Sequence, residues 1–271
     1  MFQNIKEYVK EQKEILREKI QTFKIKPTFV VIQVGNVEAS NRYVRNKIKD
    51  CLEVGIDAKV LHVDETISET ELLEQMIELN GSSGPDAYMV QFPLPRHINQ
   101  KTVELYVNKV KDADGFKIDS ITNPATPQGI ITYLERQGYD FENKNALVIG
   151  RSDIVGKPMA KLLLEKNCNV TVIHSKTSYL NKRNYVENAD LIICATGHQD
   201  TLTNEFCYKA NTMIFDVGIN FNSRGKLVGD CAPIIDSQVW QSPVPGGVGL
   251  LTRLQLLENI VKLYEERNNV K

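Results

Sequence analysis

The order of apolar and polar segments in the first half of the chain predicts strands that alternate with helices. Apolar runs typical of buried strands occupy residues 28–35, 58–63 and 87–91. Between them, residues 39–54 and 68–79 carry apolar side chains at helical spacing. This alternation predicts a parallel sheet that is covered by helices on both faces.

The same pattern restarts in the second half of the chain. Further strands are expected at residues 145–150, 169–173, 191–195 and 213–217. The stretch 116–129, FKIDSITNPATPQG, is typical of a loop and separates the two halves. Two sheet units in series predict two domains, which suits a chain of 271 residues.

The resulting fold class is α/β, with two parallel-sheet domains. The expected division is 1–119 plus a C-terminal helix, 250–271, for the first domain and 120–249 for the second. We expect the second domain to be Rossmann-like, and the C-terminal helix to return and pack on the first domain.

Composition and charge narrow the function classes. With 33 Lys and Arg against 34 Asp and Glu, the net charge of -1 does not favour a nucleic-acid partner. The apolar runs are strand-sized, so no membrane association is expected, and the charged N-terminal segment does not resemble a signal peptide. Five cysteines and four scattered histidines show no metal-ligand spacing. The sequence therefore favours a cytoplasmic protein with reduced thiols and no bound metal.

A glycine-containing turn after the strand at 145–150 is a candidate nucleotide site. Gly150 and Gly156 flank a strand-to-helix crossover, in which helix N–H groups can face a pyrophosphate, although plain geometry also produces such turns. No acidic residue follows the next strand, where an NAD site usually has one. Arg151 and Ser175 could instead hold a 2′-phosphate, which favours NADP; a polar surface loop is the other interpretation.

Candidate proton-transfer and substrate residues lie in the first half. Tyr43 and Lys47 are four residues apart, on one face of a predicted helix, which is also the pattern of a solvated helix surface. Gln91 ends a strand just before a proline, where it could meet a ligand or merely cap the strand. Asp114 could bind an amino-substituted ring, or simply form an Asp-Gly turn.

A Pro- and Gly-rich segment, 243–249, precedes the final helix. Its prolines restrict the backbone, and its glycines permit either positive φ angles or the close approach of a ligand. Structural and binding uses are equally compatible with the pattern, and an X-Pro bond here could be cis.

Together these segments resemble the methylenetetrahydrofolate dehydrogenase/cyclohydrolase family. The matching pieces, in family order, are VGNVEASNRYVRNKIKDCLEVGI (34–56), VQFPLP (90–95), KDADGF (111–116), PATPQG (124–129), IGRSDIVGKPMAKLL (149–163), HSKT (174–177), ENADLIICATG (187–197), FDVGIN (215–220), VGD (228–230) and SPVPGGVG (242–249). They cover nearly the whole chain, which is why their combination is far more specific than any one of them.

The resemblance implies an activity, a cofactor and a set of site residues. NADP would accept a hydride from 5,10-methylenetetrahydrofolate, and the 5,10-methenyl product would be hydrolysed to 10-formyltetrahydrofolate by a homodimeric enzyme. The implied catalytic residues are Lys47, Tyr43 and Gln91; the implied substrate-binding residues are Tyr43, Asp114, Pro245, Gly246 and Gly247; the implied cofactor-binding residues are Gly150, Arg151, Ser152, Ser175 and Ile219.

The chain also departs from the family pattern. The segment between Asp114 and Pro124 is shorter than usual, Leu250 stands where Pro is usual, and Arg253 is uncommon. These changes predict a differently shaped loop near the substrate. Three other functions remain open at this stage: a monofunctional dehydrogenase, an inactive NADP-binding regulator, and a two-domain dehydrogenase of small hydroxy acids.

Overall fold

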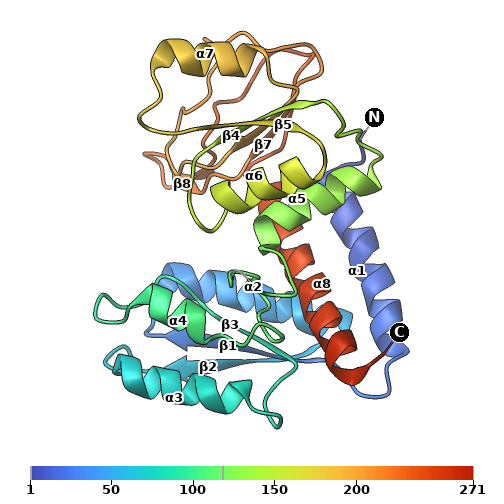
Figure 1. Ribbon diagram of the computed structural model, residues 1–271, viewed down its shortest axis with the longest axis vertical. Coiled ribbons are helices and arrows are strands. Elements are labelled where there is room, and N and C mark those ends of the chain that lie inside the picture. The colour runs from blue at the N-terminus through green and yellow to red at the C-terminus, as the bar shows by residue number, and fades with distance from the viewer. Residues whose placement is uncertain (1, 118, 271) are drawn as a thin grey trace. The chain divides into compact units, whose positions relative to one another are not determined.

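The computed structural model describes residues 2–117 and 119–270, which form two compact units (Figure 1). The first unit contains residues 10–125 and 253–270, and the second contains residues 2–9 and 126–252. Each unit is built around one parallel sheet, as the alternating pattern predicts.

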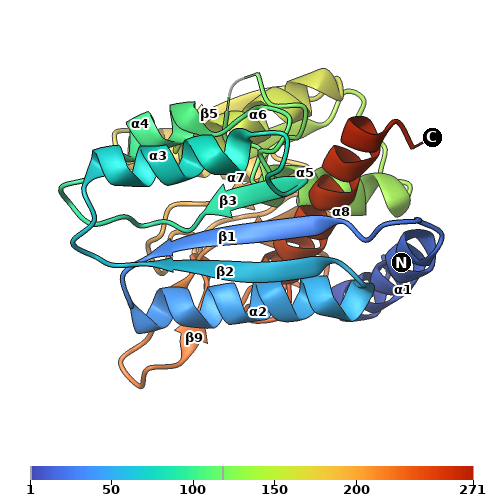
Figure 2. The ribbon, with the colours of Figure 1, turned by 90° about the horizontal axis from the view of Figure 1, so that it is seen from below.

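The sheet of the first unit consists of β1 (Thr28–Val34), β2 (Asp57–Val63) and β3 (Ala87–Val90), in the order β2-β1-β3. The strands are parallel, as Figure 2 shows for this sheet. Beyond β3, the backbone N–H of Tyr88 donates to Lys111 O (2.9 Å), and that of Ala113 donates to Tyr88 O (3.2 Å). Residues 111–113 therefore extend the sheet and bring Asp114 to the carboxyl end of β3.

Both faces of this sheet are buried. Alternate side chains of β1 point to opposite faces: Phe29 and Val31 join a core formed with α1 (Ile5–Gln21) and α2 (Glu38–Val54). Val30 and Ile32 join the opposite core, which is formed with α3 (Glu69–Asn80) and α4 (Gln100–Tyr106). Figure 2 shows α2 on one side of the sheet and α3 on the other.

Local signals in the sequence fix the ends of two of these helices. Gly55 ends α2 with a φ of 97°, a conformation that only glycine adopts readily. At the start of α3, the Ser68 side chain accepts from the Glu71 N–H, and the Glu71 carboxylate accepts from the Ser68 N–H, which completes a capping box.

The second unit has a five-stranded parallel sheet in the order β10-β7-β6-β4-β5. Its strands are β4 (Asn145–Ile149), β5 (Asn169–Ile173), β6 (Leu191–Cys194), β7 (Met213–Asp216) and β10 (Trp240–Gln241), and its helices are α5 (Ala125–Arg136), α6 (Gly156–Glu165) and α7 (Tyr179–Glu187). A hairpin of β8 (Asn220–Phe221) and β9 (Leu227–Val228) accompanies them. In chain order within this unit the sheet reads 2-1-3-4-5, a doubly wound arrangement whose ligand crevice lies between strands 1 and 3, here β4 and β6.

The long helix α8 (Val248–Asn268) confirms the expected return of the chain. Its residues from Arg253 onward belong to the first unit, where Leu256, Leu257 and Ile260 join the core that contains Phe29 and Val31. The apolar side chains of a helix that follows the whole second sheet in the sequence thus complete the core of the first sheet.

The N-terminal residues differ from the division expected from the sequence, which placed 1–119 in one domain. Residues 2–9 group with the second unit because Tyr8 packs edge-on against Tyr133, with ring centroids 5.0 Å apart, and Tyr133 Oη donates to Gln3 O (2.6 Å). These contacts join residues that are about 125 positions apart, so local pattern carries no sign of them.

The stretch expected to be a loop, 116–129, is helical from Ala125 onward. Pro127 lies in the first turn of α5. N–H groups in the first turn have no acceptor within the helix, so the N–H that proline lacks costs no helical hydrogen bond, and its fixed φ suits the helix. Pro and Gly in this stretch were therefore signs of a helix start rather than of a continuing loop.

Candidate functional site

The structure brings Lys47 and Gln91 into contact in the first unit. Lys47 lies on α2, and its Nζ is 3.2 Å from Oε1 of Gln91, which follows β3. The same Nζ lies 3.4 Å from Sδ of Met89, a weak acceptor. Within the described residues, Lys47 Nζ is thus held by one amide oxygen and one thioether rather than by a direct ion pair.

The orientation of the Gln91 amide follows from its other contacts. Its Nε2 donates to the Phe92 carbonyl oxygen (2.7 Å), which leaves Oε1 directed at Lys47. The main chain is also held, because Gln91 N–H donates to Ile32 O (2.9 Å). The strand end therefore presents a preset acceptor to the lysine.

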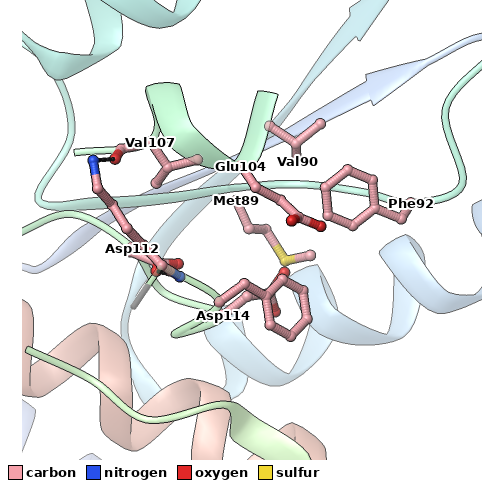
Figure 3. Close-up of a pocket in the computed structure, with 9 residues that line it drawn as sticks. Met89, Val90, Phe92, Glu104, Val107, Asp112 and Asp114 are labelled. Carbon is pink, nitrogen blue, oxygen red and sulfur yellow. Dashed lines mark hydrogen bonds between the residues drawn. The ribbon is translucent and has the colours of Figure 1, made fainter. Parts of the chain in front are cut away.

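Asp114 lines a small hollow together with Met89, the residue whose sulfur lies near Lys47 Nζ (Figure 3). The other lining residues are Met89, Val90, Phe92, Glu104, Val107, Asp112, Phe116 and Lys117. The rings of Phe92 and Phe116 stack with centroids 6.3 Å apart, and in Figure 3 the Met89 sulfur points toward Asp114. The hollow thus places two aromatic rings beside the carboxyl groups of Glu104, Asp112 and Asp114, and its volume of about 10 Å³ has room for about one water molecule.

Burial shifts the protonation of Lys47 and Asp114 in opposite directions. Burial lowers the pKa of the Lys47 ammonium, and the Asp114 carboxylate partly opposes this shift. Burial raises the pKa of the Asp114 carboxyl to about 6, although the Lys47 charge lowers it. Two groups shifted toward neutrality beside one hollow are the usual sign of a proton-transfer site.

The other candidate substrate-binding residues lie on α2 and in the turn before α8. Tyr43 is one helical turn before Lys47 on α2, with its side chain 40% exposed. Pro245, Gly246 and Gly247 belong to the second unit, in the turn that leads into α8, and the Val244–Pro245 bond is cis. A side chain at Gly247 would meet Pro243 O at 2.4 Å, so this turn is closely packed on itself.

The candidate nucleotide turn of the second unit needs both of its glycines. Gly150 has a φ of 121°, and an added Cβ would lie 2.1 Å from Ala195 O at the end of β6. At Gly156 an added Cβ would lie 2.4 Å from Gly150 O. Ser152 Oγ accepts from Gly156 N–H (3.4 Å), which orders the first turn of α6. The end of β4 therefore approaches both β6 and α6 closely, at the crevice between β4 and β6.

Arg151 and Ser175 follow neighbouring strand ends. Ile149 pairs with Ile173, and Gly150 N–H donates to Ile173 O (2.9 Å), so the residues after β4 and β5 emerge side by side. Both side chains are exposed. An arginine and a hydroxyl suit a phosphate group, and no acidic residue stands among residues 174–177 after β5, so this donor set fits the 2′-phosphate of NADP. Ile219, 54% exposed, follows β7 in the same sheet.

Two buried aspartates were missed as a pair by the sequence reasoning. Asp216 accepts from the N–H groups of Gly218 (2.9 Å) and Asp230 (2.8 Å). Asp230 accepts from the N–H groups of Thr196 (2.6 Å) and Gly197 (3.0 Å). They tie the loop after β6 to the loop after β7, at the edge where Arg151 and Ile219 lie. The motifs FDVGIN and VGD contain them, but only tertiary contacts reveal this function.

Metal binding and membrane insertion find no support within the described residues. Among them, no group of three or more His, Cys, Asp or Glu side chains could hold a metal ion. No helix in the same part of the chain is long and apolar enough to cross a bilayer.

Two family models match the chain. The tetrahydrofolate dehydrogenase/cyclohydrolase catalytic domain matches residues 1–114, and the NAD(P)-binding domain of the same family matches residues 124–268. Among curated relatives, the bifunctional protein FolD of Enterococcus faecalis is 40% identical over 267 residues, covering 94% of this chain and 93% of its own length. FolD of Thermodesulfovibrio yellowstonii is 38% identical and covers 92% of this chain and 91% of its own length.

Solved structures agree with these matches. The bifunctional FolD methylenetetrahydrofolate dehydrogenase/cyclohydrolase from Campylobacter jejuni superposes with a TM-score of 0.92 at 37% identity, covering 97% of this chain and 98% of that one. The FolD enzyme of Trypanosoma brucei, solved with NADP cofactor and an inhibitor, gives 0.89 at 26% identity, covering 100% and 99%.

Proposed function

Because the chain belongs to the tetrahydrofolate dehydrogenase/cyclohydrolase family, we propose that it catalyses two successive reactions of one-carbon folates. The first oxidises 5,10-methylenetetrahydrofolate with NADP, and the second hydrolyses the 5,10-methenyl product to 10-formyltetrahydrofolate. The observation that carries the proposal is the contact between Lys47 and Gln91 beside a hollow lined by Asp114. In this scheme the first unit binds folate and the second binds NADP.

In the oxidation, the residues of this chain bind and orient the reactants. NADP, when bound, supplies the hydride acceptor. Arg151 and Ser175 would hold its 2′-phosphate, the turn at Gly150 and Ser152 would receive its pyrophosphate, and Ile219 would pack against it. In the first unit, the Asp114 carboxylate accepts hydrogen bonds from the amino-substituted folate ring, and Tyr43 packs beside that ring.

In the hydrolysis, Lys47 moves protons. The lowered pKa gives Lys47 a population of neutral amine, which takes a proton as water adds to the methenyl carbon. The resulting ammonium then gives a proton to the ring nitrogen as its bond to that carbon breaks. The added hydroxyl loses its proton to solvent as the formyl C=O forms, so one proton is released overall and Lys47 is neutral again. Gln91 Oε1 keeps Nζ in place through both transfers.

This geometry supports two activities rather than one. A monofunctional dehydrogenase would not need a lysine whose pKa is lowered and whose Nζ is held by an amide oxygen. An inactive regulator would not need the Asp114 carboxyl to be kept in a hollow next to that lysine. A two-domain dehydrogenase of small hydroxy acids is not favoured, because both domain models that match the chain belong to the tetrahydrofolate dehydrogenase/cyclohydrolase family.

The test is an absorbance assay in which purified protein is mixed with 5,10-methylenetetrahydrofolate and NADP, with NAD in parallel. Reduced cofactor should form with NADP much faster than with NAD, and little methenyl product should accumulate. Persistent methenyl product would mean that the protein is a dehydrogenase without efficient cyclohydrolase. Absence of reduction with either cofactor would contradict the proposal.

A pH prediction follows from the Asp114 carboxyl. Its folded-state pKa of about 6 lies above the ordinary value of 3.8, so the proton is held more tightly in the fold than in the unfolded chain. The carboxylate that binds folate is therefore lost as pH falls through about 6, and kcat/KM for 5,10-methylenetetrahydrofolate should fall with it. Rates measured between about pH 5 and pH 8 should show this limb. The variant Asp114→Asn should lack it, and an identical acid limb in that variant would assign the limb to another group.

We place a homodimer interface at the outer edge of β5 as part of the proposal. This strand pairs with β4 and forms the edge of the sheet. Val172 on β5 is 40% exposed, and Leu164 on α6 is 59% exposed. Edge strands of two copies can pair across a twofold axis and cover such side chains. Sedimentation equilibrium should give a dimer for the parent chain and a monomer after Val172→Lys; a parent monomer at micromolar concentration would contradict it.

We also assign the enzyme to the cytoplasm. All five cysteines are free thiols in the structure, four of them buried. Thiols that remain unpaired are typical of a reducing compartment.

A further inference from the structure

The short segment after Asp114 closes on itself within the first unit. Gly115 has a φ of 69°, and an added Cβ would lie 2.3 Å from the Asn123 carbonyl carbon, so the two ends of the segment touch. The Ala125 N–H donates to Asp114 O (3.3 Å). The departure from the family length therefore produces a tight loop whose exit runs directly beside Asp114.

A buried amide of α8 joins both ends of this loop. Asn259, 3% exposed, donates through Nδ2 to Ala113 O (2.9 Å) and to Asn123 O (3.1 Å). Its Oδ1 accepts from Gln255 Nε2 (3.1 Å), which is four residues earlier on the helix. Both protons of the amide and its oxygen are thus engaged, so the side chain has one orientation.

The peptide groups on either side of Asp114 are held as a result. The carbonyl before Asp114 is bound by Asn259, and the carbonyl of Asp114 itself is bound by Ala125. We propose that Asn259 is a positioning residue for folate binding, which fixes the direction in which the Asp114 carboxylate enters the hollow. This inference rests on the proposed function, since it assumes that Asp114 binds the substrate.

Other contacts hold different parts of the same loop. The Asp112 carboxylate accepts from the N–H groups of Gly115 and Lys117, both at 2.9 Å, which shapes the turn after Asp114. Lys262, nearly one helical turn beyond Asn259, donates through Nζ to Ile121 O (2.5 Å) and is exposed. Lys262 therefore offers a matched control: it anchors the middle of the loop from the same helix but does not contact the peptides that flank Asp114.

The experiment compares Asn259→Leu with Lys262→Met, using steady-state kinetics of the full chain. Leucine has a similar volume but no donor, so it removes both hydrogen bonds from this side chain to the carbonyls of Ala113 and Asn123. We expect Asn259→Leu to raise the KM for 5,10-methylenetetrahydrofolate about tenfold, through a misdirected carboxylate. The KM for NADP and the dissociation constant of NADP should change less than twofold in both variants, as should the folate KM in Lys262→Met.

A double-mutant cycle with Asp114→Asn separates positioning from general destabilisation. If Asn259 acts through the carboxylate, adding Asn259→Leu to Asp114→Asn should raise the folate KM less than twofold further. A full tenfold further rise, or an unchanged folate KM in Asn259→Leu alone, would overturn the inference while leaving the proposed function intact. An inactive parent enzyme would overturn the proposed function, and the inference with it.

A second variant covers the case in which Asn259→Leu fails to fold, as judged by loss of NADP binding. Asn259→Ala leaves space for water molecules that can satisfy the Ala113 and Asn123 carbonyls. It should raise the folate KM about threefold, again without adding to the effect of Asp114→Asn. A variant that binds NADP normally and shows the parent folate KM would overturn the inference.

Discussion

Replacement of Lys47 by methionine should abolish hydrolysis of 5,10-methenyltetrahydrofolate, with a loss of about 10³-fold in kcat. Methionine retains the length and apolar stem of the lysine, so α2 and its packing should remain, but no group is left to take the proton from water. The dissociation constant of NADP should be unchanged, because the cofactor residues lie in the other unit. The decay of methenyl absorbance measures hydrolysis, and fluorescence titration measures NADP binding.

The matched control is Lys49→Met, which removes an exposed lysine two residues further along the same helix. It changes the net charge by the same amount but lies on a different face of α2. Hydrolysis in this variant should stay within twofold of the parent rate. Unchanged hydrolysis in Lys47→Met would remove Lys47 from the mechanism.

Replacement of Gly150 by alanine should weaken NADP binding and largely preserve hydrolysis, the converse of the effect of Lys47→Met. In Gly150→Ala the new Cβ would lie 2.1 Å from Ala195 O, and the φ of 121° is strained for any residue with a side chain. The turn must shift, and the ends of β4 and β6 must separate at the nucleotide crevice. We expect NADP affinity to fall about 100-fold, since a displacement of about 1 Å in a preset site costs this much. Hydrolysis of added methenyl substrate should fall less than threefold.

Gly138→Ala controls for the backbone cost alone. Gly138 also has a positive φ, 71°, but no atom lies within 4 Å of the position that its Cβ would take. It should lower the free energy of unfolding by about 1 kcal/mol and leave NADP affinity unchanged. The interpretation of the crevice fails if Gly150→Ala and Gly138→Ala bind NADP equally well. Together with Lys47→Met, these variants should separate the two activities between the two units.

The parts of the fold that could be predicted from the sequence are those that local physics determines. Gly55 and the Ser68–Glu71 pair mark helix ends through contacts within one turn, and the apolar run of β1 reports burial on both faces. Short elements were not predicted, because two residues of β10 or seven of α4 give too little periodicity to read. The extension of the first sheet by residues 111–113 was also missed, since it depends on pairing with β3.

The candidate site also has features that the sequence predicted and features that only the tertiary structure reveals. The sequence placed Lys47 on a helix and Gln91 at a strand end, but the spacing alone favoured a solvated surface for the lysine; their 3.2 Å contact is a product of the fold. Asn259 gave no signal at all, because its partners are the carbonyls of Ala113 and Asn123, and every residue has a carbonyl. Asp216 and Asp230 lie in recognisable motifs, yet their function of joining two loops requires the tertiary contacts.

The return of α8 to the first unit has a consequence for biosynthesis. A ribosome releases residues 10–125 first, but Leu256, Leu257 and Ile260, which fill the core against Phe29 and Val31, emerge more than a hundred residues later. Until then, that nascent segment exposes the part of this core that α1 and α2 leave uncovered, a state that favours chaperone binding and aggregation. Residues 126–252 can form their parallel sheet while synthesis of α8 is still under way. The unit translated first is therefore the one completed last, and ribosomal pausing before codon 253 would prolong its exposure.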